Sequence, residues 1–270
     1  MYDNYSVLMS VYKSEKPENL IIALDSIINQ TYKSNEIILV QDGPITKQLQ
    51  KVIDYYKEDL KIIKLSKNVG LGNALNIGLN SCTNELILRM DTDDYSVPYR
   101  AEKMIKVMLE YEDIDVLGTS VKEFSNSITD IKAIKIALEE NEEIYDMFKY
   151  RNPINHPSVL FRKSSVMKVG GYKDMKFNED YYLWVRLAIQ GAKFANLSEP
   201  LVYMRINEES YSRRRGYDYY KVQKKLFKFM RNNSFISYKQ YLFNNLVRFI
   251  TKVMIPTKVM QKIYINFLRK

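Results

Sequence analysis

The sequence predicts an α/β fold in which a mostly parallel sheet carries helices on both of its faces. Strand-like and helix-like segments alternate regularly over the first 117 residues, and the strand-like runs are short and apolar. Polar residues follow these runs, and open α/β sheets bind ligands at the carboxyl ends of their strands. We therefore expect one rim of the sheet to carry a binding site.

The expected elements of the first half follow one another in order. Short apolar runs predict strands at residues 5–12, 36–40, 61–65, 85–90 and 114–117. Apolar residues at helical spacing predict helices at residues 17–28, 46–57, 70–79 and 98–111. Pro17 suits the first turn of its helix, and Gln41-Asp42-Gly43-Pro44 marks a turn after the second strand.

The second half has a less regular pattern. We expect a strand or irregular segment at 128–136, a helix at 139–148, a strand at 158–162, a helix at 179–190, and short strands at 193–197 and 201–206. From residue 217 onward the pattern is helical and basic, with an interruption at Pro256. We therefore divide the chain into a body, 1–212, and a helical C-terminal region, 213–270.

The net charge of +9 is unevenly distributed between these two parts. Residues 213–270 hold 15 Lys and Arg and one acid, Asp218, whereas the first 212 residues hold 26 basic and 31 acidic residues. The body is therefore mildly acidic and the C-terminal region strongly basic. Such an asymmetry predicts that the C-terminal region contacts an anionic surface.

Composition also predicts a compartment. No stretch of 18 uncharged apolar residues occurs, so we expect no transmembrane helix, and the first residues lack the basic flank and apolar core of a signal peptide. The single cysteine, Cys82, allows no internal disulfide and fits a reducing compartment. We expect a cytoplasmic protein.

An acidic triplet, Asp91, Asp93 and Asp94, ends the strand expected at residues 85–90. Carboxylates this close repel one another, and a shared cation removes that repulsion. Carboxylate oxygens are hard ligands that suit Mg²⁺ or Mn²⁺ together with substrate phosphates. The alternative is a solvated acidic turn in which Asp94 or Ser96 caps the following helix.

Two segments after the second and third strands could contact a nucleotide. Asp42 could accept a hydrogen bond from a base N–H, although it could equally be a turn residue. The segment from Asn68 to Asn73 contains Gly70 and Gly72 and resembles a glycine loop at a helix N-terminus, where phosphates bind well. Both the full Rossmann fingerprint and a Walker sequence are missing.

The predicted helix at 179–190 opens with two adjacent carboxylates, Glu179 and Asp180. Acids in a first helical turn favour the helix dipole, but a carboxylate there could also act as a general base. Trp184 could stack on a sugar or lie in the core. The only histidine, His156, could bind substrate or belong to a loop, and one histidine excludes a histidine-rich metal site.

Several segments resemble, in order and spacing, the inverting glycosyltransferases of family 2. They read SVLMSVY, VQDG, KNVGLGNALNIGL, RMDTDD with VPYR, NHPSVLFRK with GGY, and NEDYYLWVRLAIQG, and they cover about residues 4–206. The resemblance is strongest to bacterial enzymes that assemble O-antigen, capsule or exopolysaccharide. It implies a GT-A fold, with a nucleotide-sugar half at 1–120 and an acceptor half at 121–212. The Gln-x-x-Arg-Trp motif of processive synthases is absent, so we expect transfer of a single sugar.

The resemblance implies roles for individual residues. It implies that the donor is bound by Ser10, Tyr12, Asp42, Asn68, Gly72 and Asp91. Asp91 and Asp93 would form the DxD motif that binds Mn²⁺ or Mg²⁺. Asp180 would be the catalytic base. We place Glu179, His156 and Trp184 at the acceptor. The expected reaction is one inverting displacement that moves a hexose, galactose or glucose, from UDP to a glycan acceptor carried on a lipid diphosphate.

The basic C-terminal region interleaves aromatic residues with Lys and Arg, as in helices that bind anionic membrane surfaces. We therefore expect peripheral association with the inner face of the cell membrane. The alternative is that its apolar faces pack on the body or on a second subunit, which would give a homodimer.

Two other functions compete with this interpretation. Basic and aromatic residues together also suit nucleic acid, but that function leaves the acidic triplet without a purpose, so we expect no nucleic-acid partner. A nucleotidyltransferase would also use a parallel sheet with metal-binding carboxylates, and it would release pyrophosphate rather than UDP.

Overall fold

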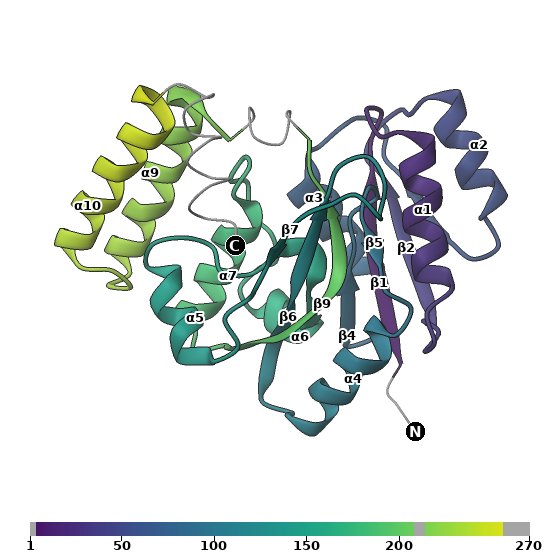
Figure 1. Ribbon diagram of the computed structural model, residues 1–270, viewed down its shortest axis with the longest axis horizontal. Coiled ribbons are helices and arrows are strands. Elements are labelled where there is room, and N and C mark those ends of the chain that lie inside the picture. The colour runs from purple at the N-terminus through teal and green to yellow at the C-terminus, as the bar shows by residue number, and fades with distance from the viewer. Residues whose placement is uncertain (1–3, 208–213, 256–270) are drawn as a thin grey trace.

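The computed structural model describes residues 4–207 and 214–255. Its strands form one mixed, nine-stranded sheet in the order β3-β2-β1-β4-β8-β6-β9-β5, with β7 paired to β6 (Figure 1). The first four strands are β1 (Tyr5–Val11), β2 (Glu36–Gln41), β3 (Lys61–Lys64) and β4 (Leu86–Arg89). These four run parallel, so all their carboxyl ends meet at one rim.

The helices of the first half lie close to their predicted positions. They are α1 (Pro17–Ile28), α2 (Lys47–Tyr55), α3 (Leu71–Ser81) and α4 (Arg100–Glu110). Pro17 occupies the first turn of α1 as expected, and Thr46 caps α2 by accepting a hydrogen bond from the N–H of Leu49 at 3.2 Å. The alternation therefore predicted this half correctly.

The second half differs in strand order. Its strands are β5 (Tyr95–Ser96), β6 (Ile114–Phe124), β7 (Ile131–Lys135), β8 (Leu160–Arg162) and β9 (Lys193–Arg205), and β8 runs antiparallel between β4 and β6. The two short strands expected at 193–197 and 201–206 form the single strand β9, which pairs with β6 in parallel through register shifts. The mostly parallel α/β sheet is confirmed, with antiparallel strands inserted in its second half.

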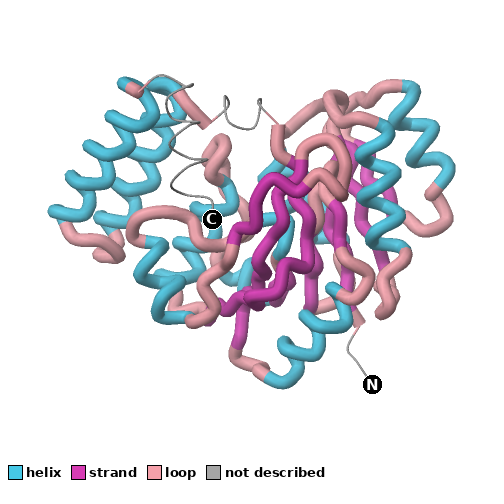
Figure 2. The backbone as a smooth tube through the Cα atoms, viewed as in Figure 1, coloured by secondary structure: helices cyan, strands magenta, loops and turns pink. Residues whose placement is uncertain are grey.

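Helices lie on both sides of the strands (Figure 2). Alternate residues of the strands face two separate hydrophobic cores. Val7, Met9 and Leu39 pack against α1, α2 and α4 on one face. Leu8, Ile38 and Val40 pack against α3 and the later helices on the other face. These later helices are α5 (Asn141–Phe148), the 3₁₀ turn η1 (His156–Ser158), α6 (Lys163–Lys168) and α7 (Glu179–Ile189).

The C-terminal region forms two antiparallel helices beside α5 and α7 (Figure 1). They are α9 (Gly216–Asn232) and α10 (Tyr238–Phe249), followed by the π-helical turn η2 (Ile250–Met254). Leu226, Phe227 and Met230 of α9 join the core that also contains α7. Part of the predicted C-terminal region therefore packs on the body, and the predicted boundary at residues 212 and 213 lies outside the described residues.

Among the described helices none has the length and apolar character needed to cross a bilayer.

Candidate active site

Predicted donor residues gather where β1, β2, β3 and β4 end. Ser10 lies at the end of β1 and Tyr12 directly follows it, with 38% of its surface exposed. Lys13, Asp42 and Asn68 line a cavity of about 390 Å³ together with Pro44, Ser66 and Lys67. The convergence predicted from the strand ends is therefore present in the structure.

Asp42 holds the wall of this cavity in place. Its carboxylate accepts hydrogen bonds from the N–H of Val69 at 2.7 Å, the N–H of Gly70 at 3.1 Å and Nδ2 of Asn68 at 2.9 Å. Gly43 has a φ of +84°, and a Cβ there would lie 2.5 Å from the backbone nitrogen of Asn68, so the turn requires glycine. Asp42 is 4% exposed and shapes the cavity through the loop at 68–70.

The acidic triplet forms a compact cluster at the end of β4. One carboxylate oxygen from each of Asp91, Asp93 and Asp94 lies within 4.8 Å of the others. The Asp91 carboxylate pairs with the guanidinium of Arg89, a residue that is 1% exposed. Asp94 accepts a hydrogen bond from the N–H of Arg205 at 2.7 Å, while its Oδ2 is buried without a partner among the described residues.

This cluster has the chemistry of a divalent metal site. Burial and the charges of Asp91 and Glu15 raise the pKa of Asp93 to about 7, and burial with the charges of Asp93 and Asp91 raises the pKa of Asp94. A bound cation would remove this repulsion and satisfy the buried oxygen of Asp94. The carboxylates therefore fit Mg²⁺ or Mn²⁺, and Asp93 is the member whose carboxylate is not engaged by Arg89 or Arg205.

Arg205, at the end of β9, ties the acidic turn to the second half of the chain. Its Nε donates to the carbonyl oxygen of Asp93 at 3.0 Å, and its Nη1 donates to that of Ser125 at 2.9 Å. The guanidinium also lies 4.5 Å from the ring centroid of Phe124. The position of Asp93 therefore depends on a residue 112 positions away in the sequence.

The second pair of carboxylates lies at the N-terminus of α7. Asp180 accepts a hydrogen bond from Nδ2 of Asn152 at 2.9 Å, and burial raises its pKa. Burial and the charge of Asp180 raise the pKa of Glu179 to about 7. Raised carboxyl pKa values in a polar rim are typical of groups that take up protons near neutral pH.

Arg89 and Tyr172 lie close to both carboxylate groups, although the sequence pattern gave neither of them a role. Arg89 pairs with Asp91, and its charge acts on Glu179, Asp180 and His156. The Tyr172 hydroxyl lies 2.9 Å from Nε2 of His156. An arginine inside an apolar run just before three acids was the only sequence signal for the buried ion pair.

A paired amide contact joins α3 to the segment before α7. Asn76 donates from Nδ2 to the carbonyl oxygen of Tyr172 and accepts from the Tyr172 N–H, both at 2.7 Å. A Cβ at Gly72 would meet Cβ of Glu179 at 3.4 Å and Cβ of Tyr172 at 3.5 Å. Gly72, expected beside the nucleotide, therefore packs against the start of α7.

Two of the residues placed at the acceptor are buried. Trp184 is 0% exposed and packs against Phe161 and His156, so the predicted stacking surface for a sugar is wrong. Its position on the inward face of α7 explains this, because that face carries the core. His156 is also buried, and burial lowers its pKa well below the usual value. The prediction that His156 binds the acceptor is therefore wrong, because its imidazole is buried and contacts the hydroxyl of Tyr172 instead.

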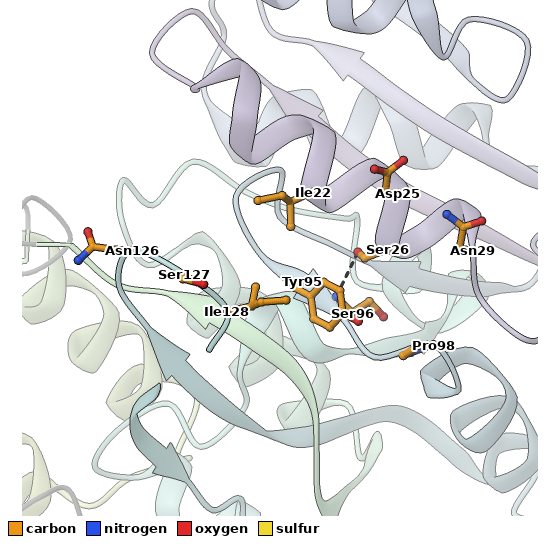
Figure 3. A pocket seen from close by; sticks show the side chains of 10 residues that line it. All are labelled: Ile22, Asp25, Ser26, Asn29, Tyr95, Ser96, Pro98, Asn126, Ser127 and Ile128. Carbon is orange, nitrogen blue, oxygen red and sulfur yellow. Dashed lines mark hydrogen bonds between the residues drawn. The ribbon is translucent and has the colours of Figure 1, made fainter. Parts of the chain in front are cut away.

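A larger cavity lies apart from these groups (Figure 3). It has a volume of about 470 Å³ and lies between α1, β5 and the loop that joins β6 to β7. Ser26 in its wall accepts a hydrogen bond from the N–H of Ser96 at 3.1 Å. It contains none of the residues predicted for donor, metal or acceptor.

Comparisons with known proteins agree with this geometry. Glycosyl transferase family 2 matches residues 6–170. The amylovoran biosynthesis glycosyltransferase AmsE of Erwinia amylovora is 38% identical over 96% of this chain and 97% of its own. The UDP-Gal:alpha-D-GlcNAc-diphosphoundecaprenol beta-1,3-galactosyltransferase of Escherichia coli is 36% identical over 98% of this chain and 97% of its own.

A solved structure extends the comparison to the fold. Residues 1–349 of TarS from S. aureus, in complex with UDP-GlcNAc, match with a TM-score of 0.69 and 20% identity, over 93% of this chain and 73% of that chain. The predicted GT-A fold is therefore confirmed. From the family match and the two relatives aligned over almost their full length, we conclude that the chain belongs to glycosyl transferase family 2.

Proposed function

We propose that this enzyme transfers one hexose from a UDP-sugar, with inversion at the anomeric carbon, to a glycan acceptor carried on a lipid diphosphate. One observation carries the proposal: two groups of carboxylates, Asp91–Asp94 and Glu179–Asp180, lie near the same buried residues, Arg89 and Tyr172. The Asp91–Asp94 cluster lies at the rim of strand ends that also carries the cavity walled by Asp42, and Asp180 lies at the start of α7. One group can hold a donor diphosphate while the other receives an acceptor hydroxyl.

Each side chain then has a defined task. The loop at 68–70, held by Asp42, shapes the cavity for the uracil, and Ser10 and Tyr12 at the end of β1 precede Lys13 in its lining. Mn²⁺ or Mg²⁺, held by Asp93 and Asp91, would neutralise the charge that develops on the diphosphate. Asp180 removes the proton of the attacking hydroxyl, and Asn152 fixes its carboxylate for this step. The hydroxyl attacks from the face opposite the diphosphate, so no enzyme nucleophile is required.

The choice of substrates rests on the relatives. The Escherichia coli relative is named for transfer from UDP-Gal to an N-acetylglucosamine linked to diphosphoundecaprenol, and its alignment covers almost the whole of both chains. AmsE is named for amylovoran biosynthesis. We therefore place this enzyme in the assembly of a surface polysaccharide, with UDP-galactose or UDP-glucose as donor.

A screen of nucleotide sugars tests this function. The full chain is incubated with each UDP-sugar, Mn²⁺ and a soluble sugar-diphosphate alkyl ester, and both UDP and the glycosylated product are measured. We expect UDP release that depends on the acceptor, and a product of inverted anomeric configuration. Pyrophosphate release from a nucleoside triphosphate would instead identify a nucleotidyltransferase, and a retained configuration would contradict the inverting mechanism.

We also propose that α10 places the enzyme on an anionic membrane surface. One side of α10 and its extension η2 is exposed and almost wholly apolar, with Leu242, Phe243, Leu246, Ile250 and Met254 all more than one third exposed. The adjacent helix α9 presents exposed lysines at 221, 224, 225 and 228. An apolar helix face next to lysines matches the chemistry of anionic lipid headgroups over acyl chains.

Co-sedimentation with vesicles tests this placement. We expect the wild-type chain to pellet with vesicles that contain anionic lipid, and a Leu242→Ser, Leu246→Ser double variant to remain largely in the supernatant. Equal recovery of both proteins in the pellet would contradict the proposal. If the same face joins two copies, the wild type will elute as a dimer in the absence of lipid and the double variant as a monomer.

A further inference from the structure

Positive side chains gather on the acceptor side of the site, where they act on one another and where two of them, Lys135 and Arg214, also interact with Asp180. They come from three parts of the chain that are distant in sequence: the end of β7, the loop after α5, and the region from residue 214 to η2. The six side chains are Lys135, Arg151, Arg214, Arg215, Arg248 and Lys252. We call this group the acceptor-side cations.

Contacts connect these cations to the base. Arg151 directly precedes Asn152, whose amide holds Asp180 at 2.9 Å. Lys135 donates from Nζ to Oδ1 of Asn155 at 2.5 Å, on the same loop. Arg248 donates to the carbonyl oxygen of Tyr150, which fastens α10 to this loop. The cations from the C-terminal region and those from the acceptor half therefore meet at one place.

The cations repel one another. Burial and the nearby Arg214 and Arg151 lower the pKa of Lys135 to about 8, against the opposing charges of Glu123 and Asp180. Burial together with Arg248, Arg215 and Arg214 lowers the pKa of Lys252 to about 8. Like charges held together in this way favour an anionic ligand.

The donor diphosphate does not account for this group. In an inverting displacement the base and the leaving diphosphate lie on opposite faces of the anomeric carbon, so cations on the side of the base are poorly placed to neutralise the leaving group. The acidic cluster, with a bound metal ion, would serve that purpose. We therefore assign an anion near Asp180 to the acceptor.

We propose that Lys135, Arg151 and Arg214 form a subsite for the diphosphate of the acceptor, one sugar ring away from the hydroxyl that Asp180 deprotonates. This inference rests on the proposed function and adds the residues that select the acceptor. Arginine side chains suit such a ligand because their planar guanidinium groups bind two phosphate oxygens at once. Arg151 and Arg214 are both exposed, so a ligand can reach them.

The test compares three soluble acceptors that carry the same sugar on a short alkyl chain: a diphosphate ester, a monophosphate ester and an uncharged glycoside. No bilayer is present. We expect the wild type to prefer the diphosphate ester, and Arg151→Gln and Arg214→Gln each to lower kcat/KM for that acceptor about tenfold, the factor expected for a lost charged hydrogen bond. The loss for the uncharged glycoside should be much smaller, and the KM for the UDP-sugar should stay unchanged. All rates are compared on the alkaline plateau of the pH profile, because the charge of Arg214 lowers the pKa of Asp180.

Matched controls separate this proposal from its alternatives. Lys106→Gln, an exposed lysine on α4, should leave all three acceptors unaffected. Equal losses on charged and uncharged acceptors, or no loss at all, would overturn the subsite. Losses that occur only when anionic vesicles are added would assign the cations to lipid headgroups instead. Absence of transfer to every acceptor by the wild type would refute the proposed function itself, a result distinct from failure of the subsite.

Discussion

The donor rim and the acceptor side of this enzyme are built in opposite ways. At the donor rim, Asp42 accepts three hydrogen bonds from one loop, Asp91 is paired with a buried arginine, and Asp94 is fixed by the backbone of Arg205. On the acceptor side most of the charged groups near Asp180 are cationic, and they come from loops and helix ends rather than from one fixed turn.

This difference follows the chemistry of the two substrates. The nucleotide diphosphate part of the donor is the same in every turnover. A rim whose loops are already fixed binds it with little loss of conformational entropy. Acceptors differ between members of a family, and exposed cations on loops and helix ends can be replaced without disturbing the core. We therefore expect substitutions at the rim to affect every reaction, and substitutions on the acceptor side to affect selection.

The largest effect should come from the base. Asp180→Asn should lower kcat about 10³-fold, since positioned general bases contribute roughly 10²–10⁴ to rates. UDP and Mn²⁺ should bind as in the wild type, because Asp180 belongs neither to the acidic cluster nor to the lining of the cavity at Asp42. Steady-state kinetics and UDP titration measure these two quantities. A variant with near-normal turnover would remove Asp180 from the mechanism.

The next largest effect should come from the metal cluster. Asp93→Asn should lower activity about 10²-fold, because a bound metal stabilises transition-state charge by several kcal/mol. It should also abolish the rise in Tm that Mn²⁺ produces in the wild type. Asp113→Asn, an exposed position with an ion pair to Lys193, is the matched control. If both variants respond to Mn²⁺ like the wild type, the cluster is not a metal site.

A smaller effect should come from the wall of the nucleotide cavity. In Asp42→Asn an amide NH₂ replaces one of the carboxylate oxygens that accept hydrogen bonds from the N–H groups of Val69 and Gly70. This loss should weaken UDP binding roughly tenfold and lower the free energy of unfolding by about 1–3 kcal/mol. Calorimetric titration and thermal unfolding measure the two changes. Asp54→Asn on α2 should change neither. Unaltered UDP affinity would place the uracil elsewhere.

The smallest effect concerns pH. The pKa of Glu179 is raised from 4.5 to about 7. The ionised carboxylate therefore lowers the free energy of unfolding fully above pH 7 and does not lower it below pH 4.5. Relative to the wild type, Glu179→Gln should therefore gain stability as pH rises through this window. For each 1 kcal/mol gained, Tm should rise by roughly 2–4 °C. Thermal unfolding at pH 4.5 and pH 8 measures the difference.

Activity should change in the opposite direction with pH. Transfer requires Asp180 to be ionised, and burial raises its pKa, so wild-type kcat should fall on acidification at a higher pH than the usual pKa of an aspartate would give. Removing the neighbouring charge in Glu179→Gln should move this acid limb to lower pH. An acid limb in the same place for both proteins would show that the two carboxylates do not influence each other.

The donor rim could be predicted from the sequence because it follows from local patterns. Period-two and period-3.6 spacing placed β1 to β4, and parallel strands bring their ends together. The same spacing places Asp42, Asn68 and Asp93 directly after strands, and so at this rim. Their predicted contacts with donor and metal stay predictions.

The acceptor side could not be predicted in this way, because its contacts join distant segments. Nothing in the periodicity indicates that β8 lies between β4 and β6, or that Arg205 holds the carbonyl of Asp93. Trp184 lies in the core because it packs against Phe161 of β8 and His156 of η1, two segments that the spacing does not place beside α7. Arg89 is buried only because Asp91 folds back to meet it.

The close approach at Gly72 limits how this enzyme can be recombined with its relatives. An alanine there would just touch Glu179 and Tyr172, and any larger side chain would occupy the space that holds the start of α7. A hybrid that takes its first 120 residues from one enzyme and its remainder from another would therefore keep the base in register only if both parents have a small residue at this point. New sugar linkages should be easier to obtain by exchanging acceptor-side surface residues than by exchanging whole halves.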